Sequence, residues 1–310
     1  MHVAVFADIE GSFGIWRMRQ CHTGTAEWQY GRTCLTEDVN YVVKGAFDGG
    51  ATQVTVMDTH DTGFNCLVPK LDKRAAYIGG HFTKPTFFGN VSDYDLILYV
   101  AIHAASGTPD SFFPHTHLGI FSEVRINGRI VCEMDIYGAY LGEFGVPVAF
   151  VSGEEIAVKQ ALQALPWAKW VVVDKHKETY VAGKESIKYL EKGRNNQREM
   201  AADAVKHAST MKPLVLSGPF KFEATFRNEK LTKKYNTWGF KRSGKTVEWQ
   251  TANMIEGFNE LNKLTFFPKR YFALRGVMFF FFRNYFRIKH GYFAPAPNPE
   301  GAILERYKDE

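Results

Sequence analysis

The chain has 310 residues, of which 45% are hydrophobic, 15% aromatic and 23% charged. This composition supports a sizeable buried core, predicts two domains or one large one, and excludes disorder over most of the chain. The formal net charge is +5, but residues 227–245 carry net +6 and residues 261–299 net +7, which leaves −8 elsewhere. The basic C-terminal third can serve an anionic ligand, nucleic acid, a membrane surface or an acidic face of another copy, or it can be a plain solvated surface.

Neither a membrane span nor a disulfide framework is indicated. The apolar run at residues 276–282 is seven residues long, whereas a bilayer span needs about 20. The first residues enter an apolar segment without the basic leader of a secretory signal. The four cysteines form no close pair, so reduced thiols are expected. We therefore expect a cytoplasmic protein with no membrane span, and we find no nucleic-acid module.

Strands and helices alternate in the first third of the chain. Apolar runs at residues 2–7, 54–57 and 96–102 predict buried strands. Between the first two, Thr36 precedes two acids and an apolar repeat at helical spacing, and Gly49 follows it, which predicts a helix. This alternation predicts an α/β fold with a mostly parallel sheet flanked by helices.

The alternation continues and then changes in character. Ser152 and Glu155 form a capping box, which predicts a helix that reaches about Ala164. The elements expected after it are a strand at 167–173, helices at 184–191 and 195–209, strands within 214–226 and a helix at 251–264.

The pattern predicts two domains. We expect a larger α/β domain over residues 1–211 and a smaller α+β domain over residues 212–310 that ends in a basic, aromatic extension. Within that extension, residues 276–282 predict a strand or helix buried in a subunit contact, with docking on a membrane surface as the alternative.

Three predicted strands end in residues that can bind a metal. Asp8, His60 and His103 stand at successive strand ends, and ligands of an open α/β sheet bind outside the carboxyl ends of its strands. Glu10 points to the same side as Asp8 in an extended segment, and Glu133 ends a further predicted strand. Carboxylates and imidazoles without a thiolate suit zinc or manganese. Since five ligands exceed the needs of one catalytic zinc, two ions that share a bridging carboxylate are the economical interpretation.

Each of these residues also has an ordinary structural explanation. A lone histidine after a strand is more often a satisfied core residue, and an aspartate there is commonly a turn former. Recurrence at several consecutive strand ends favours the metal site. The loop that follows His103 adds His115 and His117, which would share a face if extended. Either could be a ligand, a proton carrier or a residue that orients the ligands.

These residues stand in a series of motifs that is similar to a known family. The motifs are Asp8-Ile-Glu10-Gly11, Leu35-Thr36-Glu37-Asp38-x-Asn40-Tyr41, Val56-Met57-Asp58-Thr59-His60, the Thr108-Pro109 loop between His103 and His115, Glu133 followed by Ala139-Tyr140, Gly145-Val146-Pro147-Val148 and Ser152-Gly153-Glu154. In this order, over roughly residues 1–210, the chain resembles the DppA-like D-aminopeptidases, which are binuclear zinc metallopeptidases. The resemblance is weaker to about residue 264, and none covers residues 265–310.

The resemblance implies a set of site residues. The five that fall on the family's ligands to a pair of zinc ions are Asp8, Glu10, His60, His103 and Glu133. Among them Asp8 matches the bridging carboxylate, and His115 falls on the catalytic histidine. The loop before His115 is one residue longer than the family pattern, so His117 stays as the alternative, although the 18-residue distance to Glu133 favours His115.

The resemblance also implies an activity and an assembly. The activity is that of a metal-dependent aminopeptidase that removes the N-terminal residue, a D-amino acid, from short peptides. In it a water activated by two zinc ions attacks the carbonyl, while His115 protonates the leaving amine, braces the intermediate or attacks directly. The assembly is a homo-oligomer, a pentameric ring or a decamer of two stacked rings. Two alternatives are a related amide hydrolase acting on a specialised non-peptide metabolite and a non-catalytic anion-binding scaffold.

Overall fold

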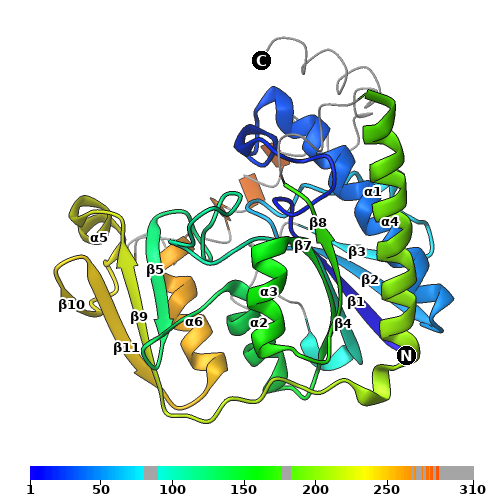
Figure 1. The fold of residues 1–310 in the computed structure, drawn as a ribbon. Coiled ribbons are helices and arrows are strands. Elements are labelled where there is room, and N and C mark those ends of the chain that lie inside the picture. Colours follow the sequence, from blue (N-terminus) through cyan, green and yellow to red (C-terminus); the bar gives the residue numbers. More distant parts are fainter. Residues whose placement is uncertain are drawn as a thin grey trace.

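The computed structural model describes residues 1–79, 90–175 and 183–266, together with 269, 274, 277, 278, 280, 281, 284 and 285. Of the predicted element at 276–282, the structure describes residues 277, 278, 280 and 281. Val277, Phe280 and Phe281 are exposed on the single chain, and burial in a subunit contact remains a prediction. Two sheets organise the described chain, one of six strands and one of five (Figure 1). None of the helices described is long and apolar enough to cross a membrane.

The six-stranded sheet is parallel throughout, with the order β3-β2-β1-β4-β7-β8. Its strands are β1 (His2–Ala7), β2 (Gln53–Asp58), β3 (Ala76–Ile78), β4 (Leu96–Ile102), β7 (Val148–Glu154) and β8 (Lys169–Val173). Every residue of β4 and β7 is buried, as expected when helices cover both faces of a parallel sheet. The predicted mixed α/β fold with a mostly parallel sheet is confirmed.

Helices cover both faces of this sheet (Figure 1). On one face lie α1 (Ala26–Asp48) and α4 (Gly183–Lys206), and on the other lie α2 (Glu133–Gly142) and α3 (Glu155–Ala164). Short 3-10 turns join the elements at Met18–Gln20, Val68–Lys70, Val91–Asp93 and Ala208–Thr210.

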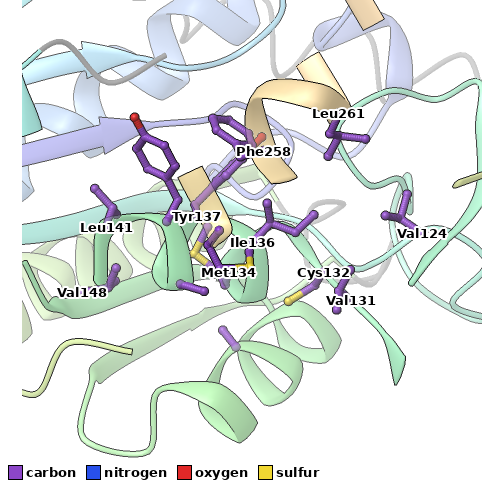
Figure 2. Packing of buried hydrophobic residues seen from close by; sticks show 14 of the residues in the cluster. Val124, Val131, Cys132, Met134, Ile136, Tyr137, Leu141, Val148, Phe258 and Leu261 are labelled. Carbon is purple, nitrogen blue, oxygen red and sulfur yellow. The ribbon is translucent and has the colours of Figure 1, made fainter. Parts of the chain in front are cut away.

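The second sheet is antiparallel and has the order β10-β11-β9-β5-β6. Its strands are β5 (Phe121–Ile126), β6 (Arg129–Ile130), β9 (Phe220–Phe226), β10 (Lys241–Ser243) and β11 (Thr246–Thr251). The helices after residue 212 include α5 (Glu229–Tyr235) and α6 (Met254–Phe266). On α6, Phe258 and Leu261 pack against the α2 side of the core (Figure 2). Strands β5 and β6 of this sheet come before residue 212 in the chain, and β9, β10 and β11 come after it. The domain boundary at residues 211 and 212 remains a prediction.

The helix predicted to begin at Thr36 begins ten residues earlier, at Ala26. Thr25 caps it by accepting a hydrogen bond from Trp28 N, whereas the Thr36 hydroxyl donates to the Arg32 carbonyl inside the helix. The prediction was wrong because the first turns lack the apolar repeat. Burial of Trp28 and its neighbours holds them helical instead.

Three other local predictions were wrong. Ser152 does not cap a helix but lies in β7, where its hydroxyl accepts a hydrogen bond from Gln197 of α4 at 3.1 Å. The two helices predicted at 184–191 and 195–209 form the single helix α4. Within it Gly193 marks a close approach rather than an end, because a Cβ there would lie 2.3 Å from the Phe13 ring. The strand predicted to end at Glu133 ends at Ile130.

Candidate metal centre

The five candidate ligands converge at one edge of the parallel sheet. Asp8 follows β1, His60 lies two residues beyond β2 and His103 follows β4, and these three strands are neighbours. Glu10 lies in the turn after β1, while Glu133 is the first residue of α2 rather than a strand end. The carboxyl ends of the strands thus bring the side chains together as the sequence predicts.

Asp8 lies between the two imidazoles. Its Oδ1 is 3.1 Å from Nδ1 of His60, and its Oδ2 is 3.3 Å from Nε2 of His103. One carboxylate therefore presents a different oxygen to each histidine, which is the arrangement needed to bridge two cations.

A second carboxylate accompanies each histidine. Nδ1 of His60 also lies 3.3 Å from Oε2 of Glu10, and Nε2 of His103 lies 3.5 Å from Oε1 of Glu133. The donors therefore form two half-sites that share Asp8. One is the His60 half-site, with Glu10, and the other is the His103 half-site, with Glu133.

Backbone carbonyls orient both imidazoles. Nε2 of His60 faces the Cys21 carbonyl at 2.9 Å, and Nδ1 of His103 faces the Ala104 carbonyl at 3.2 Å. A carbonyl only accepts, so these nitrogens carry the protons and donate to it. The other ring nitrogen of each histidine faces the carboxylates, where it can hold either a proton or a metal ion.

The buried carboxylate of Glu10 tests whether a cation fits. Glu10 is fully buried, and neither of its oxygens has a hydrogen-bond partner among the described residues. A buried charge is costly unless it is paired or binds a metal. Donor atoms of Asp8, Glu10 and His103 lie within 4.8 Å of one another. This set of oxygen and nitrogen donors fits a divalent cation such as zinc.

The electrostatics of the cluster favour positive charge within it. Although burial opposes the shift, hydrogen bonds from His103 and His60 hold the pKa of Asp8 well below its usual range. Burial also works against the shift at His60, where the charges of Glu10 and Asp8 raise the pKa well above normal. At His103 the same balance holds, and the charges of Glu133 and Asp8 raise its pKa. A site that holds protons this strongly suits cations in their place.

His115 lies directly over His103. Their rings stack with centroids 3.7 Å apart and planes 6° from parallel. Nδ1 of His115 donates to the Phe113 carbonyl at 2.9 Å, which leaves Nε2 to face Oε1 of Glu10 at 3.8 Å. Burial and the charge of His103 lower the pKa of His115, so its ring is neutral near pH 7. Donor atoms of His103, His115 and Glu133 also lie within 4.8 Å, so the geometry admits His115 as a ligand too.

His117 turns away from His115. Its backbone φ is +66°, so the segment is not extended and the two histidines do not share a face. Its N–H donates to Oε1 of Glu133 at 2.7 Å, and its Nδ1 lies 3.2 Å from the Tyr137 hydroxyl. His117 therefore contacts Glu133 and Tyr137, whereas His115 faces the cluster of donor atoms.

Asn65 supports the loop that carries His60, and this role was not predicted from the sequence. Its side chain donates to the His60 carbonyl at 2.6 Å and to Asp58 at 2.9 Å, and it accepts from Trp28 Nε1 at 2.9 Å. Asn65 is fully buried. The only signal in the sequence was its place five residues after His60, which is no pattern in itself.

Asp38 supports the turn that carries Glu10. Its Oδ2 accepts from Phe13 N at 2.8 Å, and its Oδ1 accepts from Arg194 Nε of α4 at 2.8 Å. The sequence flagged Asp38 only as part of a motif. Because Asp38 lies on α1, these two hydrogen bonds connect α1 and α4 to the turn after β1.

Glu154 shows how a strand-end carboxylate can lack a metal role. Its two oxygens accept from Ala104 N at 3.0 Å and Phe112 N at 2.6 Å. These bonds hold the loop that leads to His115. Because backbone donors satisfy both of its oxygens, Glu154 differs from Glu10, whose oxygens have none.

Known proteins that are similar to this chain are D-aminopeptidases. A family model described as D-aminopeptidase matches residues 1–262. A D-aminopeptidase of Bacillus subtilis (strain 168) is 26% identical over 274 residues, which cover 86% of this chain and 97% of that protein. The solved structure of the Zn-dependent D-aminopeptidase DppA from Bacillus subtilis, described as a self-compartmentalizing protease, shares the fold. Its TM-score is 0.75 at 24% identity, over 86% of this chain and 97% of that one.

The family match covers most of the chain and confirms the resemblance found in the motifs. It includes every candidate ligand and His115, and it ends before the basic, aromatic extension. This match shows that the chain belongs to the D-aminopeptidase family.

Proposed function

We propose that this aminopeptidase binds two zinc ions and removes a D-amino acid from the N-terminus of short peptides. The observation that carries the proposal is the position of Asp8, which turns one oxygen to His60 and the other to His103. The family match supports the aminopeptidase activity. The zinc dependence of the Bacillus subtilis enzyme supports the choice of metal.

Five residues would hold the two ions. Glu10 and His60 would hold one ion, His103 and Glu133 would hold the other, and Asp8 would be shared between them. When bound, the ions supply an activated water and polarise the carbonyl of the scissile bond.

His115 moves the proton in this reaction. Its Nδ1 proton is held by the Phe113 carbonyl, so Nε2 is the atom that accepts a proton near the ligands and returns it to the leaving amine. The stack on His103 fixes the ring in place. A neutral imidazole at neutral pH is in the state that such a proton acceptor requires.

Assembly and location belong to the same proposal. The related enzyme is self-compartmentalizing, and we expect this chain to form a pentameric ring or a decamer of two rings. The four cysteines are free and buried, which suits a reducing compartment such as the cytoplasm. Light scattering on the purified protein measures the assembly, and the mass of a single chain would contradict it.

Metal analysis combined with a substrate screen tests the function. The expected result is two zinc ions per chain and release of the N-terminal residue from D-alanyl peptides, lost on chelation and restored by zinc. Inactivity of the two-zinc protein on every D- and L-aminoacyl peptide would overturn the proposal. So would binding of a single ion per chain.

A His115→Ala variant tests the proton carrier. It should keep both ions and lose activity by about 10²–10⁴-fold, the usual contribution of general acid–base catalysis. Loss of an ion instead would make His115 a ligand, and nearly full activity would remove it from the mechanism.

A further inference from the structure

The carboxylate of Glu133 accepts hydrogen bonds from two groups that are not proposed metal ligands. The backbone N–H of His117 donates to its Oε1 at 2.7 Å. The Tyr137 hydroxyl forms a second hydrogen bond to the same carboxylate. The front of Oε1 faces Nε2 of His103 at 3.5 Å. The carboxylate is therefore oriented before an ion arrives.

The two supporting residues are joined to each other. Nδ1 of His117 lies 3.2 Å from the Tyr137 hydroxyl. An ionised carboxylate only accepts hydrogen bonds, so the hydroxyl gives its proton to Glu133 and accepts one from the imidazole. The hydrogen bonds therefore run in one direction: the His117 imidazole donates to the Tyr137 hydroxyl, and the hydroxyl donates to the Glu133 carboxylate.

Aromatic packing holds His117 and Tyr137 in place. The ring of Phe258, from α6, meets the His117 ring edge to face at 5.8 Å and the Tyr137 ring at 5.6 Å. On another side Tyr99 stacks on Tyr137 at 6.2 Å. Figure 2 shows Tyr137 of α2 and Phe258 of α6 packed close together. Tyr137 is 5% exposed, so its hydroxyl has little freedom to turn elsewhere.

The backbone at His117 adopts a conformation that such a residue rarely keeps. Its φ of +66° is in the left-handed region, as is that of Phe113 in the same loop at +52°. A residue other than glycine rarely adopts this conformation and keeps it only where its surroundings require it. Here the left-handed residue is the one whose N–H reaches Glu133.

We propose that His117 and Tyr137 are positioning residues that orient Glu133 and thereby set the affinity of the His103 half-site for its ion. This inference rests on the proposed two-metal function and assigns His117 a role distinct from that of His115. It also links α6 to the metal centre through Phe258. Partners that orient metal ligands from behind commonly contribute about 10–100-fold in metal affinity or activity.

The Tyr137→Phe variant is the main test, because it removes one oxygen and keeps the ring against Phe258 and Tyr99. Titration of the metal-free protein with zinc, followed by calorimetry, should show one ion bound about 10–100-fold more weakly and the other unchanged. Activity should fall at low zinc and recover when zinc is in excess. A purely structural role would not produce this zinc-dependent recovery.

Tyr99→Phe is the matched control. Tyr99 is equally buried and stacks on Tyr137, but its hydroxyl lies 3.0 Å from the Thr59 hydroxyl. It should leave both zinc affinities as they are in the natural protein. Equal weakening by both substitutions would overturn the inference, because the effect would then come from packing.

Two substitutions at His117 separate its side chain from its backbone. His117→Asn tolerates a left-handed backbone and keeps a nitrogen near the position of Nδ1, so it should retain most of the zinc affinity. His117→Leu removes the donor and should resemble Tyr137→Phe. Unchanged affinity of both ions in Tyr137→Phe and His117→Leu would refute the inference. The proposed function is judged separately, from the two ions and the activity of the natural protein.

Discussion

Gly11 sets the distance between the turn that carries Glu10 and the end of β4. Its N–H donates to the Ala101 carbonyl at 2.8 Å. A Cβ at this position would lie 2.4 Å from the Ile102 carbonyl oxygen and 2.5 Å from the Ala101 carbonyl carbon. Both obstacles are backbone atoms, which cannot rotate away as the end of a side chain can. We therefore predict that Gly11→Ala moves Glu10 away from His103.

The size of the effect follows from these contacts. The 2.4 Å approach must open to at least 3.0 Å, and to 3.4 Å before the contact is ordinary. A shift of about 1 Å in a catalytic group can cost about 10²-fold in rate. Overpacking of this kind also destabilises a protein by about 1–3 kcal/mol. We expect kcat/KM to fall by about 10²-fold and zinc to bind more weakly.

Peptide hydrolysis and zinc titration, run beside urea unfolding, measure these effects. Gly119→Ala is the control, because a Cβ there meets nothing within 4 Å and the backbone is not left-handed. If Gly11→Ala matched Gly119→Ala in activity and zinc affinity, the turn after β1 would not be what places Glu10, and the reasoning would be refuted.

Three further predictions concern single side chains. Glu10→Gln removes a carboxylate charge that faces His60 and the proposed ion, so zinc should stabilise the variant less than the natural protein in thermal unfolding; equal stabilisation by zinc would exclude Glu10 as a ligand. Asn65→Ala should cost about 1–3 kcal/mol in urea unfolding for each buried partner left unpaired, Trp28 among them, and should weaken the His60 half-site. Burial lowers the pKa of Lys175 to about 8, whereas the pKa of a lysine in the unfolded chain is ~10.4. Between these two pH values the unfolded chain holds the proton and the folded protein has released it, so a rise in pH favours the folded state. The natural protein should therefore gain stability over Lys175→Met from pH 8 to 10.5, and a constant difference in unfolding free energy would contradict this.

Topology explains why so much of the site was predictable. Parallel strands end at one edge whatever their order, so Asp8, His60 and His103 could be brought together without knowing that β1 lies between β2 and β4. The buried strands were predictable because apolar runs without alternation fit a sheet covered on both faces. The ligand set and the role of His115 came from the family resemblance, and they remain proposals.

Local sequence signals were the least reliable. Ser152 and Glu155 have the spacing of a capping box, yet the hydroxyl serves a contact with α4 that the sequence cannot display. The two helices predicted at 184–191 and 195–209 are one helix, and Gly193 between them makes a close contact with Phe13 that joins segments 180 residues apart in the chain. In both cases a distant partner decided the conformation.

Among the groups proposed to orient the ligands, the sequence offered only His117, with this as one of several possible roles, and it gave no signal for Asn65 or Tyr137. Asn65, His117 and Tyr137 act through hydrogen bonds to particular atoms of His60 and Glu133. Such bonds depend on side-chain direction and on a left-handed residue, neither of which has a spacing rule. The pairing of β5 with β9, about 100 residues apart, likewise has no local signal.

That strand pairing bears on how the protein can be divided. A fragment that stopped at residue 211 would contain every proposed ligand but would leave one edge of β5 with its ladder of backbone groups unmatched. It would also strip Phe258 from the rings behind Glu133. Removal of the polypeptide after residue 211 by limited proteolysis should therefore abolish activity, although it takes away none of the proposed ligands.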